Sequence, residues 1–359
     1  MVNKNHYTFK KTVNISFDTM KEWVGNIFTA SGLNEVDSSL VADSLVTADA
    51  RGVYSHGVLR VSLYTKRILK RTINTSGKPE IKRSHLGTAV IEGNNCMGQV
   101  VGDYSMRLAI DKAKQHGISF ITARGSNHYG TCAYYAMMAL EEGMIGFTTT
   151  IGGGNLMAPW GGTDARIGNN PFGIAIPAFN HYPVVLDMAQ SVVAKGKIVM
   201  ATKTKTPIPE EWAFDKHGVP TTNADEAMEG TIRPIADYKG YGIATVMGMI
   251  SSVISNASIG SSLMDVYEDF SGGLNKGHVF GAIDIKCMTE PLEFRKRMDR
   301  EIDFIKNSPK AQGVESIYLP GEPEYISYAL QKRNGIEYPI EIIEEIKQIS
   351  GNFGVPSPL

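Results

Sequence analysis

A short connection between a strand-like and a helix-like segment constrains this chain more than any other feature. Residues 118–123 (ISFITA) form an apolar run typical of a strand, and residues 132–142 have the apolar spacing of a helix. The connection between them reads Arg124-Gly-Ser-Asn-His-Tyr-Gly-Thr131. Because the backbone holds a histidine in such a turn firmly and lifts its ring away from the sheet, His128 is a candidate acid/base. A histidine that is hydrogen-bonded only for structure is the alternative.

The remaining apolar patterns predict a mixed α/β fold. A Gly/Pro-rich connection occupies residues 152–171, and the tail from residue 290 is predicted to alternate helices with a loop at 319–322. Because helices and strands do not alternate regularly, we expect a mixed sheet flanked by helices. Helices are predicted at 16–31, 35–51, 61–70, 103–116, 190–203 and 240–258, and strands at 88–92, 144–150, 173–177 and 183–187.

Composition excludes several classes of protein. The chain has 359 residues, enough for one large or two medium domains. Its 36 basic and 37 acidic residues give a net charge of −1, which argues against nucleic acid as a main partner. Cys96, Cys132 and Cys287 are scattered, so they predict neither a disulfide framework nor a metal cluster, and they suit a reducing compartment. The histidine spacing does not resemble a metal set either.

The sequence indicates neither a secretion signal nor a membrane-spanning segment. The first residues, MVNKNHYTFKK, lack the apolar core of a secretion signal. The most apolar stretch, residues 241–255, is interrupted by Ser251 and Ser252 and is too short to span a bilayer. We therefore expect that stretch to be a buried helix and the protein to be cytoplasmic.

His56 and Arg60 lie four residues apart in Ser55-His-Gly-Val-Leu-Arg60. If a helix begins there with Ser55 as its N-cap, both side chains lie on one face, a turn apart. A guanidinium fork binds a carboxylate through two parallel hydrogen bonds, and an imidazole exchanges a proton near neutral pH. The pair suits a small carboxylate-bearing substrate. The alternative is a surface helix with a solvated arginine and a capping histidine.

No segment carries the glycine fingerprint of an orthodox dinucleotide-binding fold. Gly152-Gly-Gly-Asn155 follows a strand, but Pro159 comes soon after and no helix pattern opens, so a simple turn explains these glycines. Residues 187–193 are predicted to join a strand to a helix, whose first amides would favour an anion such as pyrophosphate. Lys239, just before another predicted helix, could meet a phosphate or a substrate oxygen. A capping aspartate and an exposed lysine are the alternatives.

Eight short segments, spread over nearly the whole chain, occur in the order found in one family. They are Ala48-Asp-Ala-Arg-Gly52, Ser55-His-Gly-Val-Leu-Arg60, Ser126-Asn-His-Tyr-Gly130, Ala158-Pro-Trp-Gly-Gly162, Gly168-Asn-Asn-Pro171, Leu186-Asp-Met-Ala189, Lys239-Gly-Tyr-Gly242 and Leu319-Pro-Gly321. Each is weak alone. Together they resemble the malate/L-lactate dehydrogenase family of non-Rossmann nicotinamide oxidoreductases, which includes malate, sulfolactate and ureidoglycolate dehydrogenases, diketogulonate reductase and a cyclic-imine reductase.

The resemblance implies a fold and an assembly. It implies a helical domain built from both chain ends, residues 1–85 and 290–359, and a non-Rossmann, mixed α/β nicotinamide-cofactor domain at residues 86–289. It also implies a homodimer and NAD or NADP as the cofactor.

The resemblance also implies roles for named residues. His128 matches the acid/base of most members, His56 matches a second histidine that takes this role in one branch, and Arg60 matches the arginine that binds the substrate carboxylate. Asn170 and Pro171 match a loop that lines the same site. Cofactor contacts are implied for Asp187, Met188, Ala189, Gln190, Ser191, Lys239, Pro320 and Gly321.

The expected function is the transfer of a hydride between a nicotinamide cofactor and a small 2-hydroxy acid, malate first and lactate second. An imidazolium gives a proton to the carbonyl oxygen during reduction, and the neutral ring takes it during oxidation. Asn169 stands where the family usually has threonine, and the glycine-rich residues 150–155 form a longer segment than in relatives, so both bear on specificity. Ureidoglycolate or a cyclic imine as the substrate and a non-catalytic ligand-binding protein are the alternatives.

Overall fold

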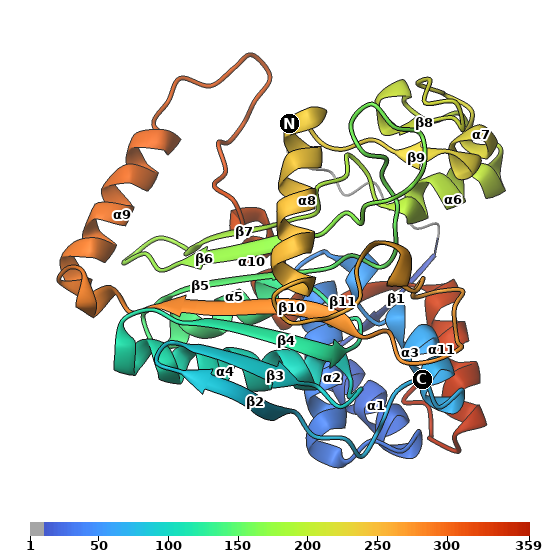
Figure 1. Cartoon of the computed structure of the whole chain (residues 1–359), viewed down its shortest axis with the longest axis horizontal. Coiled ribbons are helices and arrows are strands. Elements are labelled where there is room, and N and C mark those ends of the chain that lie inside the picture. The colour runs from blue at the N-terminus through green and yellow to red at the C-terminus, as the bar shows by residue number, and fades with distance from the viewer. Residues whose placement is uncertain (1–10) are drawn as a thin grey trace.

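A computed structural model describes residues 11–359; residues 1–10, most of the segment for which no secretion signal was predicted, lie outside the described part. A seven-stranded sheet forms its centre (Figure 1). The strands are β2 (Glu80–His85), β3 (Thr88–Glu92), β4 (Phe120–Ser126), β5 (Ile145–Thr150), β6 (Phe172–Ile176), β7 (Val184–Met188) and β10 (Lys276–Ile283). Their order is β2-β3-β4-β10-β5-β6-β7, in which β3 and β4 are parallel and the other neighbours antiparallel. The mixed α/β fold predicted from the sequence is confirmed.

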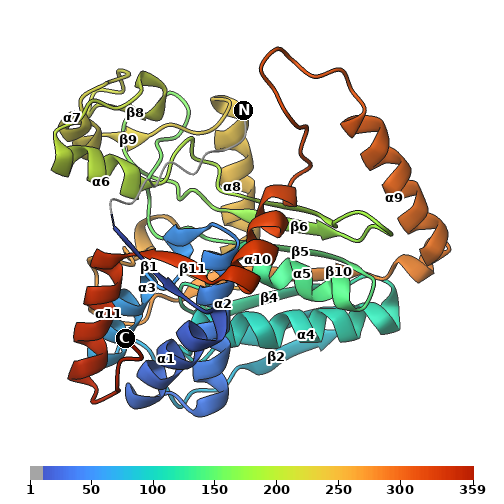
Figure 2. The ribbon, with the colours of Figure 1, turned by 180° about the vertical axis from the view of Figure 1, so that it is seen from behind.

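Helices cover both faces of this sheet. Helices α4 (Gly98–His116) and α5 (Cys132–Glu141) pack on one face, and α8 (Tyr238–Ser252) lies on the other (Figures 1 and 2). Apolar side chains of α4 and α5 meet the buried side chains of β3, β4 and β10 in one core. Helix α8 was predicted to be buried, but Val246 and Met249 are 49% and 53% exposed on its outer face, so that prediction is wrong for one side of the helix.

A second core joins the two ends of the chain. Helices α1 (Phe17–Ala30), α2 (Glu35–Ala50), α3 (Arg60–Leu69) and α11 (Ile340–Asn352) build it, and strand β1 (Thr12–Ile15) pairs with β11 (Ile336–Pro339) beside it (Figure 2). The Trp23 indole donates a 2.7 Å hydrogen bond to Ser350 Oγ across this junction. The division into a helical and a cofactor domain stays a prediction. Strand β2, which that prediction placed in the helical part, pairs with β3 of the central sheet.

The remaining elements lie at the periphery. A small lobe with its own apolar core contains α6 (Lys195–Thr204), α7 (Ala224–Glu229), β8 (Ala213–Phe214) and β9 (Thr231–Ile232). Helix α9 (Pro291–Lys306) lies at the side of the molecule, where the Asp299 carboxylate accepts the amides of Phe179 and Asn180 in the turn between β6 and β7 (Figure 1). Helix α10 (Glu322–Asn334) precedes β11.

Several sequence predictions need correction. Strands β2, β10 and β11 were not predicted, although β10 is the middle strand of the sheet. The helix predicted at 190–203 begins only at Lys195, and the helix predicted at 240–258 ends at Ser252. Strand β4 continues to Ser126, so the connection that carries His128 is shorter than expected.

Candidate active site

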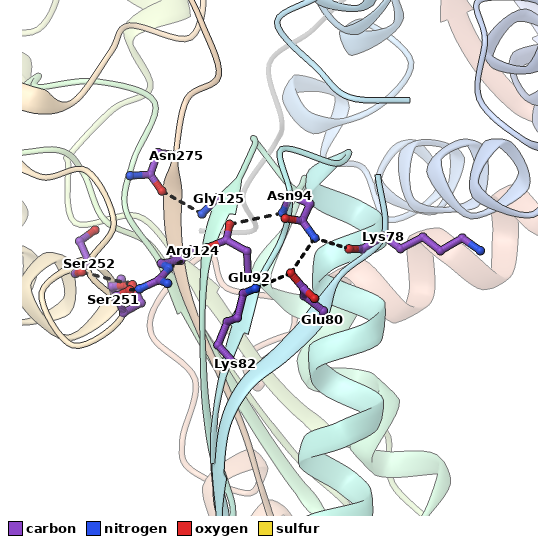
Figure 3. A network of polar contacts seen from close by, with 11 residues as sticks. Lys78, Glu80, Lys82, Glu92, Asn94, Arg124, Gly125, Ser251, Ser252 and Asn275 are labelled. Atoms are coloured by element: carbon purple, nitrogen blue, oxygen red, sulfur yellow. Dashed lines mark hydrogen bonds and ion pairs between the residues drawn. The ribbon is translucent and has the colours of Figure 1, made fainter. Parts of the chain in front are cut away.

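A polar network fixes the end of β4, from which the chain leads to His128 (Figure 3). The Arg124 guanidinium pairs with the Glu92 carboxylate on β3 at 2.8 Å, and the Gly125 amide donates to Asn275 Oδ1 at 2.8 Å. Gly125 has a φ of 59°, a left-handed conformation that favours glycine. The end of β4, two residues before His128, is therefore bonded to β3 through Glu92 and to the start of β10 through Asn275.

The turn that carries His128 is also held in place by contacts with the segment before α4 and with the start of that helix. The Asn127 amide group donates a 2.7 Å hydrogen bond to the carbonyl of Cys96. Helix α4 begins against this turn at Gly98, where a Cβ atom would lie only 2.3 Å from the His128 carbonyl oxygen. Because only glycine allows this approach, the start of α4 fixes the position of the histidine.

Three segments distant in sequence meet at the His128 ring. The Tyr64 hydroxyl on α3 lies 2.6 Å from His128 Nδ1, and the Gln99 amide on α4 donates to the same hydroxyl at 3.3 Å. The His56 ring stacks on the His128 ring, with the centroids 5.6 Å apart. The family resemblance gave both His56 and His128 a catalytic role, but the sequence reasoning missed Tyr64 and Gln99. Tyr64 follows Arg60 by four residues in a helical pattern, which is the signal that could have found it.

The condition that a helix begins at Ser55 is not met, although the helix predicted at 61–70 is present as α3. A 3₁₀ turn spans Tyr54–His56, and α3 starts afresh at Arg60. The chain folds over the buried Asp49 carboxylate, which accepts the amide of Val58 at 2.9 Å. Gly57 has φ −89° and ψ −149°, which is not a helical conformation. A Cβ atom there would overlap that carboxylate, so only glycine allows this close approach. His56 and Arg60 still face one site because the turn, rather than a helical period, brings them together.

Both histidines are neutral bases in this surrounding. Burial lowers the pKa of His56 to about 3, with a smaller contribution from the Arg60 charge. Burial also lowers the pKa of His128 well below its usual value, and positive charges add to this effect, from Arg60 first and then from His56, Lys276 and His278. Both residues are only partly buried.

Arg60 has no acidic partner in the described chain. One nitrogen of its guanidinium, Nη1, donates a 2.5 Å hydrogen bond to the Tyr267 hydroxyl, and the guanidinium lies 5.2 Å from the centre of the Tyr267 ring. Among residues 11–359 no carboxylate lies within 4.0 Å of it. A guanidinium with a neutral partner remains available to a carboxylate ligand.

Strand β10 adds two buried basic residues that the sequence reasoning missed. Lys276 Nζ donates to the Gly152 carbonyl at 2.6 Å. The His278 ring bonds Thr150 Oγ1 at 2.6 Å and Ser126 Oγ at 2.8 Å, which ties β10 to both neighbouring strands. Burial lowers the pKa of Lys276 to about 7 and that of His278 to about 3. The run Lys-Gly-His before an apolar stretch was the available signal.

The first group of predicted cofactor residues lies beside the His128 turn. Asp187 Oδ2, on β7, accepts the Ala133 amide at 2.7 Å in the first turn of α5. The amide of Val185 donates to the Pro320 carbonyl at 2.9 Å, so the loop with Gly321 runs along β7. Met188 and Ala189 are half-buried. Residues 187–193 join β7 to α6, as predicted, although α6 begins only at Lys195. An anion site at that helix start stays a prediction.

The second group is bonded to the glycine-rich segment and to α8. Asn170 is buried; its Oδ1 accepts the Gly152 amide at 2.9 Å, and its Nδ2 donates to the Ala244 carbonyl of α8 at 2.7 Å. Pro171 is half-buried beside β5, where its carbonyl accepts the Thr149 hydroxyl. Lys239 is exposed in the first turn of α8 rather than before it.

Gln190 and Ser191 connect these two groups. The backbone amide of Gln190 donates a 2.8 Å hydrogen bond to the Asn169 carbonyl. Ser191 forms an isolated antiparallel β-bridge with Pro234. The side-chain oxygen Oε1 of Gln190 is buried without a hydrogen-bond partner in the described chain. An orphaned acceptor of this kind fits a ligand that carries amide or hydroxyl donors, as a nicotinamide nucleotide does.

Two other kinds of site were sought in residues 11–359. No group of three or more His, Cys, Asp and Glu side chains there is arranged to hold a metal ion. None of the described helices combines the length and the apolar character needed to cross a membrane.

Comparison with known proteins places this chain among dehydrogenases. A family described as malate/L-lactate dehydrogenase matches residues 15–347. Malate dehydrogenase from Pyrococcus horikoshii is 35% identical over 97% of this chain and 98% of its own, and its solved structure superposes with a TM-score of 0.88. L-sulfolactate dehydrogenase from Methanocaldococcus jannaschii is 37% identical over 93% of this chain and 96% of its own, and its structure gives a TM-score of 0.89. Ureidoglycolate dehydrogenase (NAD(+)) from Escherichia coli is 31% identical over 93% of this chain and 94% of its own.

Proposed function

We propose malate as the substrate of this chain, which belongs to the malate/L-lactate dehydrogenase family and is accordingly a nicotinamide-dependent hydroxy acid dehydrogenase. Lactate is the second candidate. The non-catalytic alternative is set aside, because the relatives over the full length of the chain are dehydrogenases.

One observation carries the proposal. His128 is partly exposed and carries a neutral imidazole. The charge of Arg60, which lacks an acidic partner in residues 11–359, lowers the pKa of that ring. A 2-hydroxy acid presents a carboxylate and a hydroxyl on neighbouring carbons. Arg60 would bind the carboxylate, and this would set the hydroxyl at the imidazole with the geometry that proton transfer needs.

The contacts of His128 support a different role for each of its two nitrogens. Nδ1 is engaged by the Tyr64 hydroxyl at 2.6 Å, so Nε2 is the nitrogen that can take the hydroxyl proton of the substrate. In that tautomer Nδ1–H donates to the Tyr64 oxygen. The lowered pKa of His128 keeps Nε2 unprotonated near neutral pH, which favours oxidation of the alcohol. The bound nicotinamide supplies the hydride chemistry, and Gln190, Lys239 and the 319–321 loop are the residues proposed to hold it.

The finer identity of substrate and cofactor rests on the relatives. One relative is named for ureidoglycolate and NAD(+), and another for L-sulfolactate. We propose NAD rather than NADP as the cofactor, because the name of the ureidoglycolate dehydrogenase specifies NAD(+). Ureidoglycolate and a cyclic imine remain rival substrates of the same family.

Assembly and compartment are part of the same proposal. A homodimer is supported by exposed apolar side chains on α8, Val246 and Met249, and by Val253 directly after it. The cytoplasm is supported by three cysteines that form no disulfide in the described chain.

The substrate can be tested with the purified chain. Absorbance at 340 nm would be followed with NAD or NADP and a panel of L-malate, L-lactate, L-sulfolactate and ureidoglycolate, and in reverse with 2-oxo acids and a cyclic imine. We expect L-malate with NAD to give the highest kcat/KM. A higher kcat/KM for ureidoglycolate or for the imine would replace malate, and turnover of none of them would refute the proposed function.

A further inference from the structure

Lys276 is a buried cation with unused hydrogen-bonding capacity. Its side chain is 1% exposed, and its ammonium donates one hydrogen bond, to the Gly152 carbonyl. An ammonium has three N–H donors, and a buried charge is stabilised only when it is paired or fully hydrogen-bonded. No carboxylate of residues 11–359 lies within 4.0 Å of it.

The neighbouring charged groups are already committed to the protein. Asp265 is the carboxylate that raises the pKa of Lys276, but its Oδ1 accepts the backbone amides of Tyr267 and Glu268. The buried Arg67 guanidinium donates to three backbone carbonyls, those of Val266, Asp269 and Gly272. Arg67 Nε is also buried without a partner, but Lys276 has two N–H donors to offer and lies close enough to His128 for its charge to lower the pKa of that ring.

The sheet register places Lys276 beside the end of β4, from which the chain leads to His128. Lys276 lies opposite Ser126 of β4, two residues before His128, and the register shifts between Lys276 and His278. Such an irregularity re-aims the side chain next to it. Lys276 is close enough to His128 for its charge to contribute to the lowered pKa of that ring.

We propose that Lys276 binds a second acidic group of the substrate while Arg60 binds the carboxylate next to the reacting carbon, so that the site selects dianionic over monoanionic 2-hydroxy acids. The proposal rests on the proposed function, because it assumes that the substrate occupies the space beside His128. A dicarboxylate or a sulfonated hydroxy acid has the required second anion, and a monocarboxylate such as lactate does not. The bound anion would raise the pKa of Lys276 and keep the ammonium charged.

The test compares two substrates in three variants. Lys276→Met removes the charge and the donors, whereas Lys276→Gln keeps a donor for Gly152 without the charge. For both we expect the ratio of kcat/KM for L-malate to that for L-lactate to fall roughly 100-fold, mainly through the KM of malate, as for the loss of a charge-assisted hydrogen bond. Lys112→Met is the matched control. Lys112 is also buried, and it donates to one carbonyl, that of Leu86 in the turn between β2 and β3. That variant should leave the ratio unchanged.

Two results would overturn the inference. Equal losses for malate and lactate in both variants, or a malate KM restored by Lys276→Gln, would mean that Lys276 only anchors the glycine-rich segment. Calorimetry separates this failure from a failure of the proposed function. If the wild-type chain turns over neither acid, the binding of succinate relative to propionate in the presence of NAD is compared instead. A preference for succinate that Lys276→Met abolishes supports the inference, and a preference that survives this substitution refutes it.

Discussion

The proposed substrate side and the proposed cofactor side of the site use their polar side chains differently. On the substrate side, Arg60 and Lys276 have no carboxylate of residues 11–359 within 4.0 Å. On the cofactor side, Asn170 and Asp187 accept backbone amides, and Asn170 also donates to a carbonyl of α8. One side therefore keeps charge available for a ligand, and the other uses its side chains to hold the chain itself.

This difference separates recognition from architecture. An unpaired charge contributes little to the fold and much to the binding of an anion, so its removal should change specificity. A buried amide that bonds two backbone segments fixes the shape of a loop, so its removal should lower stability. The predictions below test this separation.

His128→Ala should have the largest effect. Removal of the base should lower kcat/KM for malate oxidation by about 10²- to 10⁴-fold, with an unchanged far-ultraviolet spectrum. Steady-state kinetics would measure this, with His56→Ala as the matched variant, because the two rings stack at 5.6 Å. A larger loss for His56→Ala than for His128→Ala would reverse the assignment of the base.

Arg60→Lys keeps the charge but removes the fork that binds a carboxylate. We expect the KM of malate and lactate alike to rise about 10- to 100-fold, because a point charge cannot form the two parallel hydrogen bonds. The equal effect on both acids distinguishes Arg60 from Lys276. If the KM of malate alone rises, the two cations have been assigned to the wrong groups of the substrate.

Asn170→Ala should act on stability instead. It leaves the Gly152 amide and the Ala244 carbonyl without their partner, at a cost of about 2 to 3 kcal/mol. Scanning calorimetry should show Tm lower by several degrees, while the ratio of malate to lactate activity stays the same. A changed ratio with an unchanged Tm would contradict the contrast between the two sides.

The pH dependence of malate oxidation should show the effect of the positive cluster. The pKa of His128 is held below its usual value by burial and by Arg60, so the neutral base is fully present at and above the ordinary histidine value of about 6.5. The acid limb of kcat/KM should therefore lie below this pH. Arg60→Met removes one of the lowering charges and should move the limb upward; a limb that stays in place would exclude Arg60 as a cause.

The sequence predicted the elements near the site well where local patterns were strong. The helix after His128 and strands β3, β5, β6 and β7 were found within about two residues, because their apolar periods and flanking glycines are local signals. Strand β10 was missed because it opens with Lys276 and contains His278, residue types that are mostly exposed. Their burial depends on partners on β4, β5 and the glycine-rich segment.

The meeting of His56 with His128 was inferred only through the family resemblance. The helical spacing considered for His56 and Arg60 does not apply, because Gly57 between them has a non-helical backbone and α3 begins only at Arg60. Tyr64 and Gln99 were missed for a related reason. Their roles come from a hydrogen-bonded chain between α3, α4 and the His128 turn, and no local pattern contains that information.

The sequence alone determined the class of fold, the residues able to move a proton or bind a carboxylate, and the order of the family segments. These follow from side-chain chemistry and from periodicities along a few turns or strands. Only the tertiary structure decided that Lys276 and His278 lie under the same site as His128, and that Asn170 bonds the backbone. Burial and electrostatic contact depend on which strands become neighbours, and that is set by the packing of segments up to hundreds of residues apart.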